Sequence, residues 1–326
     1  MLVKALIIAT SAITTLQADQ PVYFYGTIWL TTADGLLFDI RQPCGSTAGG
    51  TDGAFNGFGY SQVNGQPYCA PGPFGLIIHP DWGKTLIAPP MPLHNGLSIS
   101  RKIYVPYRPG RNYVRYLDII RNDTPHMQTA LVQFFGFSGL GNAATMRKLT
   151  NEYVMIGAVP DGAGQPPPIG VLLQNGLRHA PDKITDCIFY DAGLFSCAYL
   201  WVQIKPHSRV SLLHFVVQGK RTGPITPNVA EMQDGYDDVE QQLEELLASP
   251  AFDYLDPEDL RTLWNFFIDT DVNMDGRVNV LDLIVVRNDL TKTPESASTP
   301  RSDVNHDLRI NILDMIAIRN DLGWPY

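Results

Sequence analysis

The stretch Asp271-Val-Asn273-Met-Asp275-Gly276-Arg277-Val-Asn279-Val-Leu-Asp282 is repeated as Asp303-Val-Asn305-His-Asp307-Leu308-Arg309-Ile-Asn311-Ile-Leu-Asp314. Both copies place oxygen-bearing side chains at positions 1, 3, 5, 9 and 12 of a twelve-residue segment, which is the spacing of a calcium-binding loop. An isolated string of this kind is usually an Asx-rich surface turn. Two copies in one frame, 32 residues apart and each followed by an apolar segment, instead favour a duplicated calcium-binding unit.

The expected ligands are the five side chains and the carbonyl oxygen of position 7. They are Asp271, Asn273, Asp275, Arg277, Asn279 and Asp282 in the first loop, and Asp303, Asn305, Asp307, Arg309, Asn311 and Asp314 in the second. Gly276 permits a left-handed turn at position 6, whereas the second loop has Leu308 there. A branched residue in that conformation costs on the order of 1–2 kcal/mol. We therefore expect two Ca²⁺ ions, the second bound more weakly.

Each loop continues into a near-copied segment with helical character, residues 280–290 and 312–322. Residues 269–323, about a sixth of the chain, thus resemble a type I dockerin, the duplicated calcium-loop module that docks on cohesin domains in secreted polysaccharide-degrading assemblies. The resemblance implies a small all-α domain over residues 269–326 and a cohesin-like or other protein module as its partner. Val280-Leu281 and Ile312-Leu313 stand where familiar dockerins have small hydroxyl residues, so we expect the partner to differ from a standard cohesin.

The two helical segments carry more apolar residues than the single stripe of about 100° that buries one side of a helix. A module of this size cannot bury both faces, so one face is expected to form an interface. The expected partner-binding residues are Val280, Leu281, Ile284, Arg287, Ile312, Leu313, Ile316 and Arg319. Because the two segments are near copies, a partner could bind in either of two orientations. The alternative is that the surplus apolar residues pack on the Trp264 segment or on the rest of the same chain.

Charge is distributed unevenly along the chain. Residues 231–326 contain 21 acidic and 7 basic groups, whereas residues 1–230 contain 12 and 17, which together give the net charge of −9. The acidity therefore belongs to the calcium-binding end. No basic stripe interleaved with aromatic residues occurs, so nucleic acid is not expected as a partner.

The amino terminus has the pattern of a secretory signal peptide over residues 1–18, with Lys4, an apolar run and a cleavage point near Ala18. A buried strand is the alternative interpretation. No later run approaches the roughly 20 apolar residues of a membrane span. We therefore expect a bacterial protein that is secreted or located at the cell surface.

The four cysteines suit that location. Cys44 and Cys69 bracket one segment, and Cys187 and Cys197 bracket another, so pairing of sequence neighbours would close two loops. Each such disulfide would contribute about 2–4 kcal/mol of stability. Three connectivities are open in principle.

Residues 19–225 alternate short β-branched and aromatic runs with Gly, Pro and Asn, which predicts an antiparallel β-sandwich. The predicted strands are residues 22–30, 35–41, 75–78, 97–105, 113–121, 128–137, 153–158, 170–173, 198–204 and 208–217, with long loops at 42–73 and 159–168. Residues 226–268 are predicted as a helical connector with one helix over 233–248 and another starting at Asp256-Pro257. The β body resembles uncharacterised secreted bacterial β-domains and, more loosely, the β-supersandwich domains of glycoside hydrolases.

Sequence signals for catalysis are few. Glu152 is the one glutamate before Glu231, the histidines are dispersed, and no nucleophile motif is present. Single aspartates such as Asp118 and histidines such as His214 are more often structural than catalytic. Aromatic residues in the loops could stack on sugars, although core packing is the favoured interpretation for most of them; they are Phe55, Phe58, Tyr60, Tyr68, Trp82, Tyr107 and Tyr113.

These observations predict a secreted, non-catalytic component of an extracellular or surface assembly that is linked to polysaccharide catabolism. Its carboxy-terminal module would dock on a protein in a calcium-dependent manner, and its β body could bind carbohydrate. The first alternative is a glycoside hydrolase with its active site in the β body. The second is a structural surface protein whose calcium module docks within its own chain.

Overall fold

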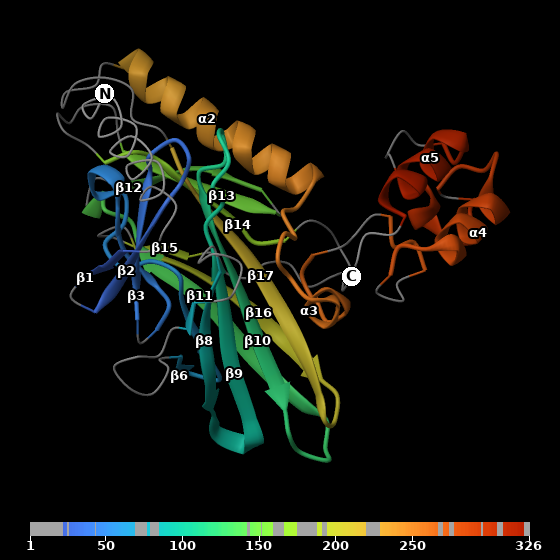
Figure 1. Cartoon of the computed structure of the whole chain (residues 1–326), viewed down its shortest axis with the longest axis horizontal. Coiled ribbons are helices and arrows are strands. Elements are labelled where there is room, and N and C mark those ends of the chain that lie inside the picture. The colour runs from blue at the N-terminus through green and yellow to red at the C-terminus, as the bar shows by residue number, and fades with distance from the viewer. Residues whose placement is uncertain are drawn as a thin grey trace, which may run out of the picture. The chain divides into compact units, whose positions relative to one another are not determined.

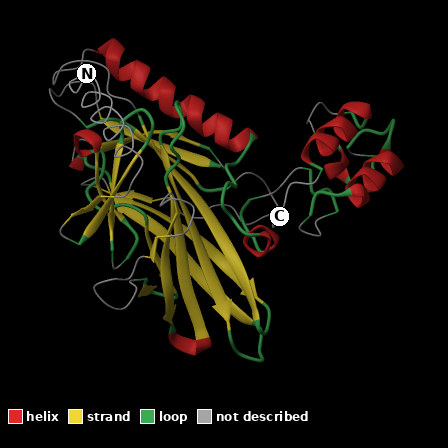
Figure 2. Ribbon diagram, viewed as in Figure 1, coloured by secondary structure: helices red, strands yellow, loops and turns green. Residues whose placement is uncertain are grey.

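The computed structural model describes residues 22–24, 26–42, 44–68, 77–78, 85–141, 144–150, 152–158, 166–174, 188–190, 194–219, 229–266, 270–273, 277–294, 296–304 and 309–322. The predicted signal peptide lies outside these residues. The chain divides into two compact units, one holding the described residues up to Ala251 and the other those from Phe252 onward. The predicted class, mainly β with a small helical carboxy-terminal module, is confirmed (Figures 1 and 2).

The first unit contains three antiparallel sheets within the described residues. The largest has the order β12 (Ala144–Leu149), β13 (Tyr153–Ala158), β14 (Ile169–Leu172), β17 (Ser208–Gln218), β10 (Tyr113–Asn122), β9 (Leu97–Tyr104), β8 (Thr85–Pro92) and β7 (Ile77–Ile78). The second has the order β15 (Ile188–Tyr190), β16 (Leu194–Ile204), β11 (Gln128–Phe137), β5 (Tyr60–Val63) and β6 (Gln66–Pro67). The third has the order β1 (Val22–Phe24), β2 (Thr27–Thr31), β3 (Leu37–Arg41) and β4 (Thr47–Gly50). Short 3₁₀ turns follow β4 (Thr51–Gly53) and β8 (His94–Gly96).

The two larger sheets share one interior. The Phe134 ring of β11 stacks on the His214 ring of β17 with centroids 4.1 Å apart, and the Tyr116 ring of β10 lies 5.7 Å from Phe134. Along β11, residues 130, 132, 134 and 136 are buried while their neighbours face outward, which is the period-2 alternation of a strand with one buried side. The body is therefore a sandwich whose core lies between these sheets.

Several strands begin and end where the sequence pattern predicts. Strands β11 and β13 have the predicted limits, and β9, β10 and β17 differ by one residue. The prediction of one long loop over residues 42–73 is wrong, because β4, β5 and β6 lie within it. Strand β8 was missed because it contains Pro89 and Pro90. Its register with β9 shifts between Ala88 and Met91, so the prolines occupy an irregularity where the missing N–H groups are tolerated.

Helix α2 (Val229–Ala248) packs on β13, β14 and β17 of the first unit (Figure 1). Its apolar stripe, Val239, Leu243 and Leu246, is fully buried at the predicted helical spacing. The close approach depends on Gly170 in β14, where a Cβ atom would lie 2.6 Å from Leu243 Cδ1 and 2.7 Å from Val239 Cγ1. The segment predicted as a connector is thus divided, because α2 lies in the first unit and α3 (Pro257–Arg261) in the second.

The second unit contains α3, α4 (Val280–Asp289), a 3₁₀ turn (Pro300–Ser302) and α5 (Ile312–Asp321). Helix α3 begins with the predicted cap, since the Asp256 carboxylate accepts a hydrogen bond from the Asp259 amide and Pro257 follows it. The core of the module is formed by six aliphatic residues: Val272, Val278, Val286, Val304, Ile310 and Ile318. Among the described residues, no helix is both long and apolar enough to cross a membrane.

Candidate metal centre and docking face

The position-12 aspartates close both loops, with a hydrogen bond to position 3 in the first loop and to position 2 in the second. The Asp282 carboxylate accepts hydrogen bonds from the backbone N–H of Asn279 at 2.9 Å and from the backbone N–H of Asn273 at 3.0 Å. The Asp314 carboxylate accepts from the backbone N–H of Asn311 at 2.8 Å and from the backbone N–H of Val304 at 2.8 Å. Each carboxylate therefore completes the capping box at the start of its own helix and joins the start of its loop to the end.

The position-9 asparagines complete this arrangement. The side-chain oxygen of Asn279, Oδ1, accepts from the backbone N–H of Leu281, and its Nδ2 lies 3.5 Å from the backbone carbonyl oxygen of Arg277. In the second loop, the Asn311 side-chain amide donates to the Arg309 carbonyl at 3.3 Å. The backbone oxygen of position 7 and the side-chain amide of position 9 therefore lie close together in both loops, and their role as ligands stays a prediction.

The donor chemistry of both loops suits calcium. Asp271 and Asp282 in the first loop, and Asp303 and Asp314 in the second, are all buried. Burying several carboxylates in a small module is costly unless positive charge compensates them. A hard dication that prefers carboxylate, amide and carbonyl oxygens meets that requirement, so the residues present fit Ca²⁺.

Several predicted ligands lie outside the described residues: Asp275, Asn305 and Asp307, together with Gly276 and Leu308. Within the described ranges alone, no cluster of three His, Cys, Asp or Glu side chains is present that could hold a metal ion. The unequal affinity of the two loops therefore stays a prediction.

The predicted partner-binding residues form the same exposed row on both helices. The exposed fractions are 61%, 51% and 39% for Val280, Leu281 and Ile284, and 61%, 53% and 41% for Ile312, Leu313 and Ile316. Arg287 and Arg319 are exposed one helical turn further along. The core of the module uses other positions, so these six apolar side chains remain available for contact. We call the two rows together the docking face.

The β body contains a buried polar cluster around Asp118 of β10. Its carboxylate accepts hydrogen bonds from Arg101 of β9, at 2.6 Å from Nε and 2.9 Å from Nη2, and from the Ser61 hydroxyl of β5. Burial favours a higher pKa for the Asp118 carboxyl, but the Arg101 charge and these hydrogen bonds outweigh it and hold the pKa below its ordinary value. Full burial with this many partners indicates a structural role for Asp118.

His214 belongs to the same interior. It is fully buried between Phe134 and Tyr199, and burial lowers the pKa of its imidazole to about 3. The imidazole is therefore neutral at physiological pH. Sequence reasoning named Asp118 and His214 singly but missed the cluster. The available signal was that Arg101, Asp118 and His214 all occupy predicted strands in which the residues two positions away, on the same strand face, are apolar or aromatic.

The aromatic residues considered for sugar binding separate into two groups. Four of them are buried and belong to the core: Phe55, Phe58, Tyr68 and Tyr113. Tyr107 is half-buried, and Trp82 lies outside the described residues. Tyr60 is also half-buried but stacks on Phe135 with ring centroids 5.5 Å apart, and the Arg41 guanidinium lies 5.9 Å from the Tyr60 centroid. The adjacent amides of Gln62 and Gln133 hydrogen-bond to each other. We call these five residues the aromatic platform.

Of the predicted disulfide residues, Cys44 and Cys197 are described, and neither is a free thiol. Cys69 and Cys187 lie outside the described residues, so the pairing of sequence neighbours stays a prediction.

Comparison with known structures finds partial likenesses at low identity. A polysaccharide lyase matches with a TM-score of 0.38 and 12% identity, over 64% of this chain and 34% of the lyase. The Slr1438 protein from Synechocystis sp. PCC 6803 matches with a TM-score of 0.38 and 8% identity, over 61% of this chain and 97% of that protein. A galactose mutarotase related enzyme from Lactobacillus acidophilus matches with a TM-score of 0.29 and 6% identity, over 64% and 100%.

Comparison with curated proteins finds no match. The family comparison concerns the loops and helices described above. Dockerin type I domains bind calcium and dock on cohesin modules. Residues 269–323 of this chain match the dockerin type I domain.

Proposed function

We propose that this chain is a secreted, non-catalytic component of an extracellular or cell-surface assembly linked to polysaccharide use. Its carboxy-terminal module would bind two calcium ions and dock on another protein through the docking face. The observation that carries this proposal is the repeated row of exposed apolar residues beside two loops with buried carboxylates. The family match of residues 269–323 supports it.

Calcium would serve a structural role in this module. Bound in the loops, the ion supplies the positive charge that offsets the buried carboxylates. Side chains of the module itself position the two helices. Asp282 and Asp314 cap α4 and α5, so the same side chains that reach the ion also fix the starting direction of the two helices. The orientation of the docking face would therefore depend on the metal.

The docking face is suited to an apolar partner surface. Burying three aliphatic side chains from one row contributes on the order of 3–5 kcal/mol before the costs of association are subtracted. The carboxylates of α4 and α5 whose side chains are described are buried, whereas Arg287 and Arg319 are exposed. The partner surface should therefore be apolar at its centre and acidic beside the arginines.

Binding of the full-length chain to a panel of cohesin modules, with calcium and with EDTA, tests this proposal. We expect binding in calcium only. Replacing Leu281 and Leu313 together by Asp should weaken it at least tenfold, because both orientations would then bury a charge. The matched control is Leu149→Asp in the β body, which is also about half exposed. Equal binding by the double variant and the control would contradict the assigned face, and no binding to any cohesin would contradict the cohesin-like partner.

Carbohydrate binding by the β body is a second candidate function, supported by the aromatic platform. Aromatic rings and neutral amides on β5 and β11, with the Arg41 guanidinium of β3 beside Tyr60, combine apolar area with hydrogen-bonding groups, which is the chemistry that a sugar ring needs. Retention of the full-length chain on insoluble polysaccharides tests this function. The variant Tyr60→Ala with Phe135→Ala should lose retention, while Met127→Ala, an exposed apolar control, should keep it. Retention unchanged in the double variant would exclude the platform as the site.

The glycoside hydrolase alternative predicts that the β body releases reducing sugar from polysaccharides. Asp118 is committed to Arg101, which leaves other body carboxylates to supply an acid and a nucleophile or base. We expect no release of reducing sugar from a panel of polysaccharides. Release that disappears when a single body aspartate is replaced by asparagine would favour the hydrolase.

A further inference from the structure

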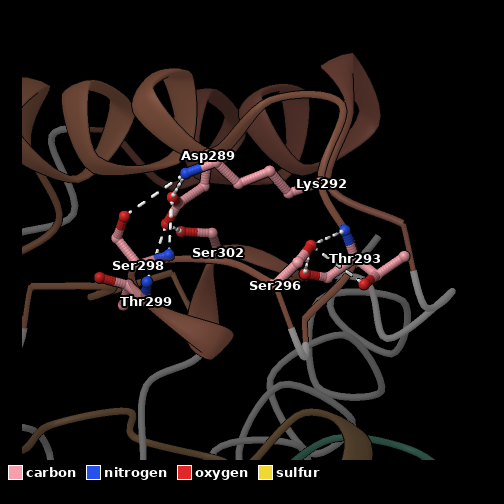
Figure 3. Close-up of polar contacts among 7 residues, drawn as sticks. All are labelled: Asp289, Lys292, Thr293, Ser296, Ser298, Thr299 and Ser302. Carbon is pink, nitrogen blue, oxygen red and sulfur yellow. Dashed lines mark hydrogen bonds and ion pairs between the residues drawn. The ribbon is translucent and has the colours of Figure 1, made fainter.

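Asp289, the last residue of α4, has a buried carboxylate with an unusual number of donors around it. One oxygen accepts from Lys292 Nζ at 2.7 Å and from the Ser298 amide at 2.9 Å (Figure 3). The other accepts from the Thr299 amide at 2.9 Å and from the Ser302 hydroxyl at 3.0 Å. A carboxylate at the C-terminal end of a helix faces the negative end of the helix dipole. These four donors compensate that unfavourable placement.

All four donors come from the connector, which we define as residues 291–302 between the two halves of the module. The connector ends at Ser302, and the next residue is Asp303, the first expected ligand of the second loop. Because Ser302 is fully buried and donates to Asp289, the position of Asp303 is fixed relative to the end of α4. The start of the second loop is thus anchored to the end of the first half.

The connector also touches both loops directly. The Thr291 amide donates to the Ile310 carbonyl at 2.9 Å, and the Ile310 amide donates to the Lys292 carbonyl at 3.0 Å. Ile310 occupies position 8 of the second loop. On the other side, Arg301 Nη2 lies 3.4 Å from the carbonyl oxygen of Asp271, position 1 of the first loop. The second loop is therefore held to the connector by a pair of backbone hydrogen bonds at position 8 and follows Ser302 directly at position 1, while Arg301 reaches the first loop at its position-1 carbonyl.

From these contacts we propose that Asp289 is a positioning residue for the second calcium loop. By holding the connector, it places Asp303 and supports Ile310, and so reduces the ordering that the loop requires before it can bind the ion. The second loop needs this support more than the first because it has Leu308 where the first has Gly276. This inference rests on the calcium binding proposed above.

Calcium titration of the full-length chain by calorimetry tests the role of Asp289, with the loops separated by ligand variants. In a chain with Asp271→Ala, the titration measures calcium binding by the second loop alone. Adding Asp289→Asn to that chain should weaken calcium binding at least tenfold. In a chain with Asp303→Ala, the first loop reports alone, and the same substitution should change affinity less than threefold. The control is Asn288→Ala, the exposed neighbour, which should leave both affinities unchanged.

A second readout needs no calcium. Amide hydrogen exchange of residues 296–304 in EDTA should be faster in Asp289→Asn than in Asn288→Ala, because the Ser298 and Thr299 amides bond to different oxygens of Asp289 and asparagine keeps only one acceptor oxygen. Ser302→Ala removes one bond and should weaken the second loop in the same direction by a smaller factor, which guards against a misfolded Asp289 variant. Equal weakening of both loops, or an unchanged second loop, would overturn the positioning role. A parent chain that binds no calcium would instead contradict the proposed function itself, and the inference with it.

Discussion

The Arg101–Asp118 pair shows how much one residue's role depends on its partners. Asp118 is fully buried and accepts from Arg101 and Ser61, and Arg101 also donates to the Gly59 carbonyl. Removing one member leaves the other charge buried without compensation, which costs about 3–5 kcal/mol. We therefore expect Asp118→Asn to lower the free energy of unfolding by that amount in urea titrations. Replacing both residues by Met and Leu should recover most of the loss, and an Asp118→Asn variant as stable as the parent would exclude a structural pair.

His214 gives a prediction for pH. Its pKa is about 3 in the folded chain and 6.5 in its ordinary state, so the unfolded chain binds a proton that the folded chain does not take up between these values. The stabilising contribution is therefore fully present above pH 6.5 and is lost as the pH falls toward 3, by up to about 1.4 kcal/mol per pH unit.

Thermal unfolding in EDTA at pH 7 and pH 4 checks this sign. The parent chain should lose stability at pH 4, and His214→Phe should lose less, because Phe can keep the stacking on Phe134 without titrating. An equal loss in both chains would show that carboxylates alone cause the acid sensitivity.

Residues whose partners are close in sequence were predictable, and those with distant partners were not. The calcium ligands lie within twelve residues of one another, so their spacing alone reveals the loop. Asp118 depends on Ser61, which lies 57 residues away, and on Arg101, which lies 17 residues away. Neither partner is indicated by any local pattern.

At the scale of elements, the packing of α2 on β14 depends on a residue without a side chain. A Cβ at position 170 would meet Leu243 and Val239 at less than 3 Å, so Gly170→Ala must displace the helix or its side chains. We expect a loss of about 1–3 kcal/mol in the free energy of unfolding. Gly49→Ala is the matched strand control, because its nearest atom would be Asp39 Oδ2 at 3.9 Å. Equal stability of the two variants would contradict close packing of α2.

Some helices and strands could be predicted from the sequence pattern, and others could not. Strands β11 and β13 have clear β-branched and aromatic runs, and α4 and α5 follow the calcium loops, so their limits were predicted closely. Strand β4 (Thr-Ala-Gly-Gly) and the proline-containing β8 have compositions typical of loops. Pairing with β3 and β9 determines these strands, and that pairing is a property of the fold.

The whole molecule consists of two units that each have a hydrophobic core. The body core lies between its sheets, and the module core is the cluster of six aliphatic residues around Val286 and Ile318. Since each core can be lost separately, calorimetry of the full-length chain should show two unfolding transitions. We expect calcium to bind the folded module and not the unfolded one, so it should stabilise one transition only. The stabilisation is about 4 kcal/mol at a thousandfold excess over Kd.

Adding EDTA should therefore lower the midpoint of the module transition and leave that of the body unchanged. The variant Asp282→Ala supplies the matched test, because it removes one loop's expected closing ligand together with the hydrogen bond that Asp282 accepts from the backbone of Asn279, the N-cap of α4. Its module transition should be lower in calcium and should respond less to EDTA than that of the parent. A control with Leu149→Asp in the body should keep the full response. If EDTA lowers both midpoints equally, calcium does not act through the module alone, and the two units do not unfold independently. If EDTA lowers neither midpoint, calcium does not stabilise the module.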